Sequence, residues 1–311
     1  MTHAPVSRIR VALAMLGLVG ATLGAPAIAR ANAPISAIEQ SAWPSMKKKV
    51  KLANGITLAF VELGNPQGPP LLLLHGYTDS SRTWSLVAPY LGKYRLLMPD
   101  QRGHGASDSP ECCYSQTQYA HDAKLFLDAM GVERAHVVGH SMGSMVAIAM
   151  AAEYPGRVNS IGLIGSTALA PVKRGDWLYD SIDGLKWPLD RSVQFLRDWH
   201  PANQPTPVDP VFAEAVRAEY MTIPRHVWRG VMRELASVPV GRHAADIKVP
   251  VLILSGGKDP IFTPEHHASL VKTFPGGDSH VFPDLGHNPN WERPGDIAAK
   301  IAEFLERNAS P

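Results

Sequence analysis

The sequence is poor in cysteine and in net charge. It has 311 residues, of which only two are cysteines, and its formal net charge is +2. A charge so near balance implies no nucleic-acid or other polyanion partner. Two cysteines cannot staple a fold of this length, so a buried core must provide its stability. Neither a metal-ligand spacing such as His-Glu-x-x-His nor a dinucleotide fingerprint is present, so no cofactor is implied.

The two cysteines, Cys112 and Cys113, are adjacent in the sequence. Their Cα atoms are closer together than ordinary disulfide geometry favours, so they can pair with each other only through a strained ring. Two thiols in a surface loop are the simplest interpretation. A vicinal disulfide and a bridge to another molecule remain open.

Long apolar runs are also missing, except near the N-terminus. Arg8 and Arg10 precede an apolar stretch over residues 11–23, and small residues follow it. This order is typical of a secretory signal peptide, and we expect residues 1–31 to be removed by cleavage after Ala31. The protein is then secreted or periplasmic, without a stable membrane span. An uncleaved membrane anchor is the alternative, although the apolar stretch is short for a span.

Short apolar runs alternate with helical patterns through most of the remaining chain. The continuous run Leu71–Leu74 is typical of a strand that is covered on both faces. The expected strands cover residues 47–52, 56–63, 71–74, 94–98, 137–138, 159–164, 251–254 and 279–282. The expected helices cover residues 82–91, 118–130, 144–152 and 296–307. This alternation predicts an α/β fold, with a mostly parallel central sheet flanked by helices.

One turn carries a recognisable chemical pattern. Gly139-His140-Ser141-Met142-Gly143 stands between a short apolar strand and a helix of small and apolar residues. This Gly-x-Ser-x-Gly turn is the nucleophile-elbow pattern, in which the serine lies at the apex in strained backbone geometry. Gly139 and Gly143 leave out side chains where the strand and helix approach each other. A tight turn with an incidental serine is the structural alternative.

Residues 171–240 form a segment of a different kind. Prolines interrupt its helical patterns, and it holds four of the seven tryptophans of the chain. A long insertion with little strand character, placed beside a candidate site, indicates a helical cap or lid. The predicted organisation is therefore a core in two parts, residues 32–170 and 241–311, with the cap between them.

Five motifs, taken in order, resemble the pattern of the α/β-hydrolase fold superfamily. They are His75-Gly76, Asp100-Gln101-Arg102-Gly103-His104-Gly105, Gly139-His140-Ser141-Met142-Gly143, Gly257-Lys258-Asp259-Pro260 and Gly286-His287. The resemblance covers nearly everything after the predicted signal peptide. More narrowly, the chain resembles the capped serine esterases, lactonases and haloperoxidase-like members. The resemblance implies the α/β-hydrolase fold with a helical cap insertion and no cofactor.

Three residues suit the catalytic triad of such an enzyme. A serine hydroxyl needs a base to remove its proton as it attacks, and histidine is the natural base near neutral pH. A buried carboxylate then fixes the imidazole tautomer. The chain order in this fold is serine, acid, histidine, and it is met by Ser141, Asp259 and His287. All three follow predicted strands, and open α/β sheets bind ligands at the carboxyl ends of their strands.

Other candidates for these roles suit them less well. Asp284 is the rival acid, but it is only three residues before His287 and more naturally shapes that loop. Some relatives place the acid after the preceding strand, where residues 165–167 offer no carboxylate. The other histidines do not combine the required loop and order. His75 and His104 follow earlier strands and are expected to shape the site, and His140 is beside the nucleophile on a tight turn and cannot easily reach its hydroxyl. His266 and His267 lie in an expected helix near Pro264.

Acyl transfer also needs donors for an oxyanion and a pocket for the substrate. The Met142 amide, at the start of the helix after the elbow, is one donor. The Tyr77 amide resembles the second oxyanion donor of this family. The alternative is that Tyr77 is simply an aromatic residue in a loop, without a role in the reaction. The predicted substrate-binding residues are Tyr77, Trp177, Trp187 and Trp199. Packing between the cap and the core is the alternative role for the tryptophans.

These features predict an exported serine hydrolase that cleaves a carboxylic ester or lactone with an apolar moiety. The partner is therefore a small molecule, and an acyl-enzyme forms on Ser141. A C–C bond hydrolase or a cofactor-free perhydrolase with the same triad is the alternative, as is a non-catalytic binding protein on this scaffold. Dehalogenases and epoxide hydrolases of this fold carry aspartate at the elbow, so the serine here disfavours both activities.

Overall fold

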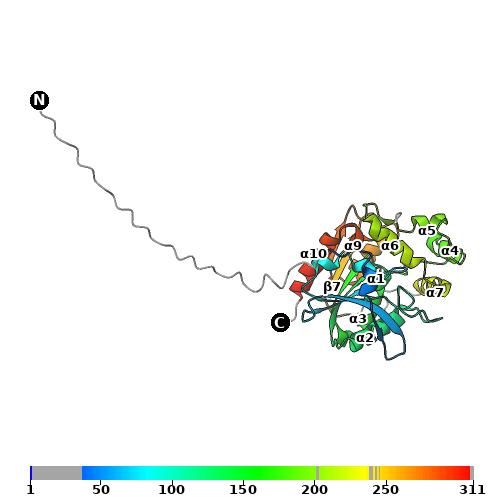
Figure 1. Ribbon diagram of the computed structural model, residues 1–311, viewed down its shortest axis with the longest axis horizontal. Helices are drawn as coiled ribbons and strands as arrows, with labels where there is room; N and C mark the ends of the chain where they lie inside the picture. Colours follow the sequence, from blue (N-terminus) through cyan, green and yellow to red (C-terminus); the bar gives the residue numbers. More distant parts are fainter. Residues whose placement is uncertain (2–36, 201–202, 238–240, 242–243, 245, 309–311) are drawn as a thin grey trace.

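An eight-stranded sheet forms the centre of the molecule (Figure 1). The computed structural model describes residue 1 and residues 37–308, apart from 201–202, 238–240, 242–243 and 245. The predicted signal peptide therefore lies outside the described residues, except for Met1. The strands are β1 (Lys48–Lys51), β2 (Thr57–Gly64), β3 (Pro70–Leu74), β4 (Arg95–Pro99), β5 (Ala135–His140), β6 (Val158–Ile164), β7 (Val251–Gly256) and β8 (Asp278–Phe282).

The sheet is mostly parallel, as the sequence predicts. Its strand order is β1-β2-β4-β3-β5-β6-β7-β8, and only the pairs β1–β2 and β2–β4 are antiparallel. In β3, Leu72 and Leu74 enter one buried core, while Leu71 and Leu73 enter the other. Alternate side chains of a strand point to opposite faces, so a continuous apolar run is buried on both sides of the sheet.

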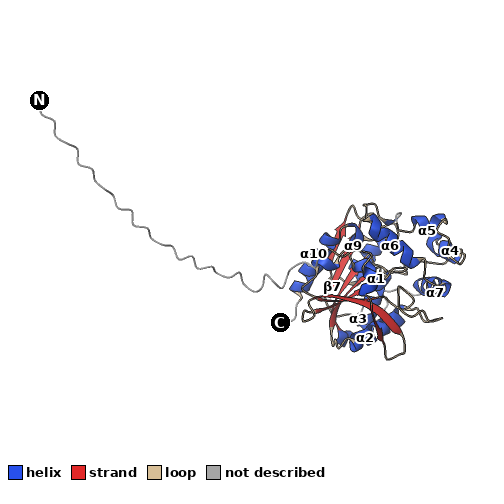
Figure 2. Cartoon of the chain, in the orientation of Figure 1, coloured by secondary structure: helices blue, strands red, loops and turns tan. Residues whose placement is uncertain are grey.

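Helices cover both faces of the sheet (Figure 2). The helices are α1 (Trp43–Met46), α2 (Gln116–Ala129), α3 (Met142–Glu153), α4 (Trp177–Asp183), α5 (Gln194–Asp198), α6 (Pro210–Tyr220), α7 (Arg225–Leu235), α8 (Pro264–Thr273), α9 (Pro289–Glu292) and α10 (Pro294–Arg307). Side chains of α2, α3 and α8 fill one core, and those of α10 fill the core on the opposite face. This arrangement is the predicted α/β-hydrolase fold.

The helix predicted over residues 82–91 is wrong. The chain instead makes two short 3-10 turns, η2 (Ser81–Trp84) and η3 (Ala88–Tyr90). The side chains of η2 serve tertiary contacts, since the indole of Trp43 donates to Ser81 Oγ and another tryptophan donates to Thr83 Oγ1. Such contacts outweigh the weak local preference for helix.

Among the described residues, the helices α4 to α7 lie between β6 and β7. Figure 1 shows α4, α5 and α7 close together at one side of the molecule, and α4 contacts α7. Their apolar side chains, including Leu178, Leu196 and Trp228, join the core on the α3 side of the sheet. The helical character of this segment agrees with that expected for residues 171–240, while the division into domains stays a prediction.

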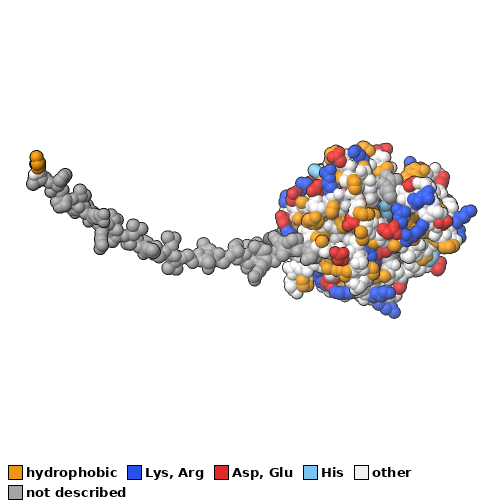
Figure 3. All heavy atoms as spheres, turned by 45° about the horizontal axis from the view of Figure 1, so that its top comes forward, with side chains coloured by type: hydrophobic (Ala, Val, Ile, Leu, Met, Phe, Trp, Pro, Cys, Tyr) orange, Lys and Arg blue, Asp and Glu red, His pale blue; other side chains and the backbone are white. Residues whose placement is uncertain are grey.

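Charged side chains of both signs are interspersed on the face of the molecule drawn in Figure 3, where hydrophobic side chains are also exposed between them. Cys112 and Cys113 are joined in a vicinal disulfide in the exposed loop between β4 and α2. The structure therefore has the vicinal pairing, and not two free thiols or a bridge to another molecule. Within the described ranges, no helix is both long and apolar enough to cross a membrane.

The close approach of α3 to β5 yields a testable prediction. A Cβ added at Gly139 would lie 2.1 Å from the carbonyl oxygen of Gly143, whereas one added at Gly156 would meet nothing within 4 Å. We expect Gly139→Ala to destabilise the fold by about 3 kcal/mol, because backbone on both sides must move. Gly156→Ala is the control and should leave the urea-unfolding free energy unchanged. Equal stability of the two variants would contradict the packing described here.

Candidate active site

The turn between β5 and α3 holds Ser141 in an uncommon backbone conformation. Its φ is 51° and its ψ is −122°, so φ is positive for a residue that carries a side chain. Such strain persists only where the surroundings enforce it. Here the amide of Ser141 donates to the carbonyl of Ile164 at 2.8 Å, and a Cβ on Gly143 would lie 2.3 Å from the Leu74 carbonyl oxygen. Packing against β3 and β6 therefore fixes the apex of the turn.

The structure brings the three predicted triad residues together. His287 Nε2 lies 2.9 Å from Ser141 Oγ, and His287 Nδ1 lies 2.8 Å from Asp259 Oδ2. Ser141 follows β5, Asp259 follows β7 and His287 follows β8, so all three lie at carboxyl ends of parallel strands. Asp284, the rival acid, is exposed and lies 3.7 Å from Arg293.

The surroundings of Asp259 keep it ionised at neutral pH. Its burial alone would raise the pKa, but the contact with His287 and hydrogen bonds from two amides hold the pKa of Asp259 below its usual value. Those amides belong to Ile261 and Phe262, and each donates to Oδ1 at 2.8 Å. An ionised carboxylate accepts only, so Nδ1 of His287 carries a hydrogen. In the neutral ring, Nε2 then has the lone pair that faces Ser141.

The two predicted oxyanion donors come from different loops. Met142 is the first residue of α3, where amide groups have no partner within the helix. Gly76, the neighbour of Tyr77, lies directly against the nucleophile, because a Cβ built on it would be 3.2 Å from Ser141 Cβ. The Tyr77 hydroxyl donates to the carbonyl of Trp228 at 2.8 Å, which ties this loop to α7. The oxyanion role of the two amides stays a prediction.

A largely apolar cavity opens above Ser141. Its apolar lining comes from the loops after β3, β6 and β7 and from helices α3, α4 and α7, and it includes Tyr77, Met142, Met145, Pro171, Val172, Leu178, Trp199, Met232, Leu235, Ile261 and Phe262. Its polar lining consists of Asp79, His140, Ser141, His200, Asn203, His287 and Asn288. Most of this lining is apolar carbon, so the cavity suits a substrate with an apolar part.

The four predicted substrate-binding residues differ in position. Tyr77 and Trp199 line the cavity, and the Trp199 indole donates to Thr78 Oγ1 at 3.0 Å. Trp177 is 58% exposed at the outer surface, and Trp187 packs edge-on against the ring of Trp228. The structure does not bring Trp177 or Trp187 to the cavity, because Trp177 at the start of α4 faces the surface and Trp187, in the loop after α4, packs against α7.

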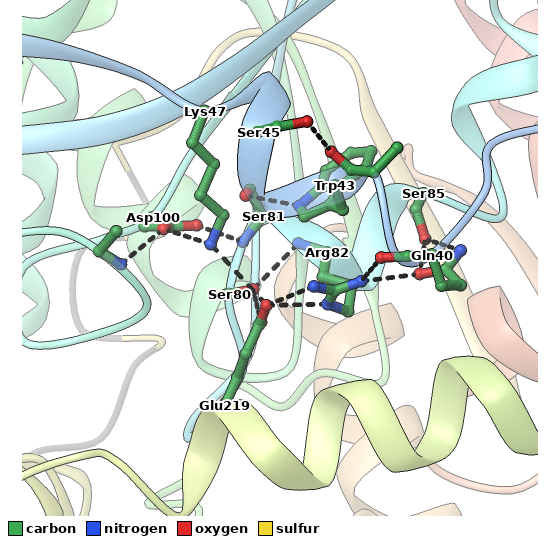
Figure 4. A network of polar contacts seen from close by, with 12 residues as sticks. Gln40, Trp43, Ser45, Lys47, Ser80, Ser81, Arg82, Ser85, Asp100 and Glu219 are labelled. Carbon is green, nitrogen blue, oxygen red and sulfur yellow. Dashed lines mark hydrogen bonds and ion pairs between the residues drawn. The ribbon is translucent and has the colours of Figure 1, made fainter.

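The loop that carries Tyr77 is held on its core side by Asp100 (Figure 4). The Asp100 carboxylate accepts from the amide of Ser81 at 2.8 Å and from that of Ala106 at 2.9 Å. Lys47 Nζ lies 2.7 Å from Asp100 Oδ2 and pairs its charge. Both oxygens of the buried carboxylate therefore have partners, and Asp100 braces this loop from the core side.

Helix α6, in the segment predicted to be the cap, holds the same loop from the other side. Glu219, on α6, accepts from Ser80 Oγ and from the guanidinium of Arg82, with Nε at 2.8 Å (Figure 4). Arg82 Nη1 also donates to the carbonyl of Gln40 at 2.7 Å, so this guanidinium joins α6 to the segment before β1. A loop fixed by the core and by the cap keeps its amides in place before any substrate arrives.

Sequence reasoning missed several residues that surround Ser141. Asp79 and Asn288 lie within or beside the predicted motif loops, but no spacing rule marks them as part of a site. His200 and Asn203 come from the segment between α5 and α6, and only the docking of that segment places them at the cavity. The one available signal was the position of Asp79, a carboxylate four residues after His75.

Comparison with known proteins agrees with this fold and geometry. A family model described as alpha/beta hydrolase fold matches residues 69–294. The chain belongs to the α/β-hydrolase family. Within the described part of this family member, no group of three or more His, Cys, Asp or Glu side chains is arranged to hold a metal ion.

Similar proteins include hydrolases with different substrates. Lipase 1 of Psychrobacter immobilis is 28% identical over 308 residues, which cover 94% of this chain and 95% of that protein. The 2-hydroxy-6-oxononadienedioate/2-hydroxy-6-oxononatrienedioate hydrolase of Burkholderia vietnamiensis is 28% identical over 257 residues, which cover 76% and 87%. A solved esterase structure from Exiguobacterium antarcticum matches with a TM-score of 0.74 at 20% identity, covering 84% of this chain and 100% of that one, which shows a shared fold alone.

The depressed pKa of Asp259 yields a prediction for stability against pH. A carboxyl whose pKa is lower in the folded than in the unfolded chain stabilises the fold above its unfolded value of about 3.9, and this stabilisation is lost as pH falls through the folded value. The difference in unfolding free energy between wild type and Asp259→Asn should therefore be largest near neutral pH and shrink below about pH 4. Asp284→Asn, at the exposed carboxylate, should show no such trend. A pH-independent difference for Asp259→Asn would contradict the assignment.

Proposed function

We propose that this protein is a serine hydrolase that cleaves carboxylic esters or lactones with an apolar part. The observation that carries the proposal is the hydrogen-bonded series Ser141–His287–Asp259 at an apolar cavity, with His287 Nε2 2.9 Å from Ser141 Oγ. The name of the similar lipase from Psychrobacter immobilis supports ester hydrolysis.

The proposed reaction uses each of these groups in turn. Ser141 Oγ attacks the ester carbonyl carbon while its proton passes to His287 Nε2, and Asp259 stabilises the imidazolium that forms. The amides of Tyr77 and Met142 donate to the resulting oxyanion. As the C–O bond to the alcohol breaks, His287 gives its proton to the leaving oxygen. Water then attacks the acyl-enzyme, its proton passes through His287 to Ser141 Oγ, and the carboxylic acid leaves.

Replacement of the nucleophile tests this proposal. Ser141→Ala should lower kcat/KM for a short-chain p-nitrophenyl ester by a factor of about a thousand or more, because attack and proton transfer act as a unit. Ser192→Ala, an exposed serine in the same chain, is the control. A fluorophosphonate should label the wild-type protein and should not label Ser141→Ala. Retained turnover in Ser141→Ala would refute the mechanism, and failure of the wild-type protein to label would favour a binding protein instead.

C–C bond hydrolysis is a second candidate for the same triad. The similarity to a hydrolase of 2-hydroxy-6-oxononadienedioate supports it, since that name describes a hydroxy-oxo dicarboxylate without an ester bond. Parallel assays with a vinylogous diketone and with the p-nitrophenyl ester distinguish the two reactions. An assay with acetate and peroxide covers the perhydrolase alternative.

We also propose that the protein is exported, on the basis of the charged, apolar and small-residue order of residues 1–31. Expression of the full chain in a bacterial host with a general secretory pathway should yield a mature protein in the periplasm or medium. Its N-terminal sequence should begin at Asn32, directly after the predicted cleavage site. An intact N-terminus in the membrane fraction would instead show an uncleaved anchor.

A further inference from the structure

One wall of the cavity presents a buried carboxylate that the proposed reaction does not use. Asp79 is 4% exposed and lines the cavity together with His140 and His200. Its Oδ2 lies 3.7 Å from His140 Nδ1, and its Oδ1 lies 3.7 Å from His200 Nε2. Both separations are too long for hydrogen bonds. Among the described residues, no group donates a hydrogen bond to Asp79 Oδ1, and His140 Nδ1 has no hydrogen-bond partner.

The hydrogen bond on the far side of His140 determines what its Nδ1 can do. His140 Nε2 lies 2.9 Å from the carbonyl oxygen of His287, and a carbonyl only accepts, so Nε2 carries a hydrogen. In the neutral ring, Nδ1 is then an acceptor that faces the carboxylate of Asp79. Across 3.7 Å this ring makes no hydrogen bond to Oδ2, and it leaves Oδ1 without a donor.

The carboxylate of Asp79 also lacks a permanent cation. Its ion-pair partners within the described chain are His140 and His200, while Lys47 and Arg82 are engaged by Asp100 and Glu219. Burial lowers the pKa of His200 to about 4, so this ring is neutral at physiological pH. A buried carboxylate that lacks donors is costly when it is ionised, and a donor on a bound ligand would remove that cost.

This carboxylate lies beside the nucleophile. The position that a Cβ of Gly76 would occupy is 2.9 Å from Asp79 Oδ2 and 3.2 Å from Ser141 Cβ. Asp79 Oδ2 and Ser141 Cβ are therefore no more than about 6 Å apart. A group hydrogen-bonded to Asp79 thus belongs to the part of a substrate next to its reacting carbonyl, rather than to a remote tail.

We propose that Asp79, with His140 and His200, forms a subsite for a hydroxyl or ammonium group attached next to the scissile ester of the substrate. The inference rests on the proposed ester hydrolase function and narrows its substrate class to esters that carry an O–H or N–H donor close to the ester bond. Binding of the donor also shields the negative charge of Asp79, which would otherwise oppose the oxyanion that develops near Ser141. The apolar lining of the cavity then takes the remainder of the substrate.

A matched set of esters tests this subsite. The substrates are ethyl butanoate, its 2-hydroxy and 2-amino derivatives, and the 2-hydroxyethyl ester of butanoic acid, with kcat/KM measured by acid release. The substituents change intrinsic reactivity, so each rate is divided by that of hydroxide-catalysed hydrolysis of the same ester. The wild-type enzyme should favour at least one donor-bearing ester over ethyl butanoate by about tenfold or more after this correction. The preferred derivative shows whether the donor is a hydroxyl or an ammonium group and on which side of the ester it lies.

Asp79→Asn then identifies the residue responsible. The amide has the same shape but offers a donor and no charge, so the preference ratio should fall about tenfold. A purely structural role would change the rates of all the esters together and leave the ratio as it was. Asp183→Asn, at a carboxylate 3.6 Å from Arg229 in the cap, is the matched control and should keep the wild-type ratio.

The outcomes separate this inference from the proposed function. If the wild-type enzyme favours no donor-bearing ester, the subsite is refuted, and this test needs no variant to fold. A ratio that stays at the wild-type value in folded Asp79→Asn also refutes it. In both cases the ester hydrolase proposal stands as long as turnover depends on Ser141, whereas turnover that survives Ser141→Ala refutes the proposed function itself.

Discussion

The near contact between α3 and strands β3 and β5 is the constraint on which the rest of the site depends. Gly139 and Gly143 have no room for a Cβ, since such atoms would lie 2.1 and 2.3 Å from backbone oxygens. The helix can therefore start directly beneath the strand ends, and the residue between them is forced to a φ of 51°. That geometry lifts the Ser141 side chain out of the packed layer toward the loops after β7 and β8. The position of the hydroxyl is thus a consequence of backbone packing.

Asp259, Asp100 and Asp79, all buried near the site, differ in how their charge is satisfied. Asp259 has two amides and His287, and Asp100 has two amides and Lys47. Asp79 faces two imidazoles at 3.7 Å and has no donor to Oδ1 within the described chain. A carboxylate with complete partners orients or braces other groups, since its acceptors are already occupied. By the same physical argument, Asp79, whose acceptor Oδ1 is unoccupied within the described chain, is proposed to bind a ligand.

The sequence predicts the parts of the site that local chemistry determines. Leu71–Leu74 reads as a strand buried on both faces, and the glycines around Ser141 read as a tight turn, because each pattern has a local physical cause. The order of Ser141, Asp259 and His287 follows because the carboxyl ends of parallel strands meet at one edge of the sheet. The sequence does not predict the 3-10 turns η2 and η3, and the helix expected over residues 82–91 is wrong, because tertiary contacts of the η2 side chains decide the conformation there.

Residues of the cap could not be placed in the same way. Trp199 reaches the cavity while Trp177 is 58% exposed, although both are tryptophans in short helical pieces of one segment. The difference depends on how that segment docks, through contacts such as Trp199 to Thr78 and Glu219 to Arg82. These partners are more than a hundred residues apart in the chain. His200 reaches Asp79 by the same docking, so the segment between β6 and β7 supplies part of the apolar wall and one polar neighbour of the carboxylate. Selectivity therefore depends on a packing arrangement, whereas the bond-breaking groups depend on strand order, and the two can change separately.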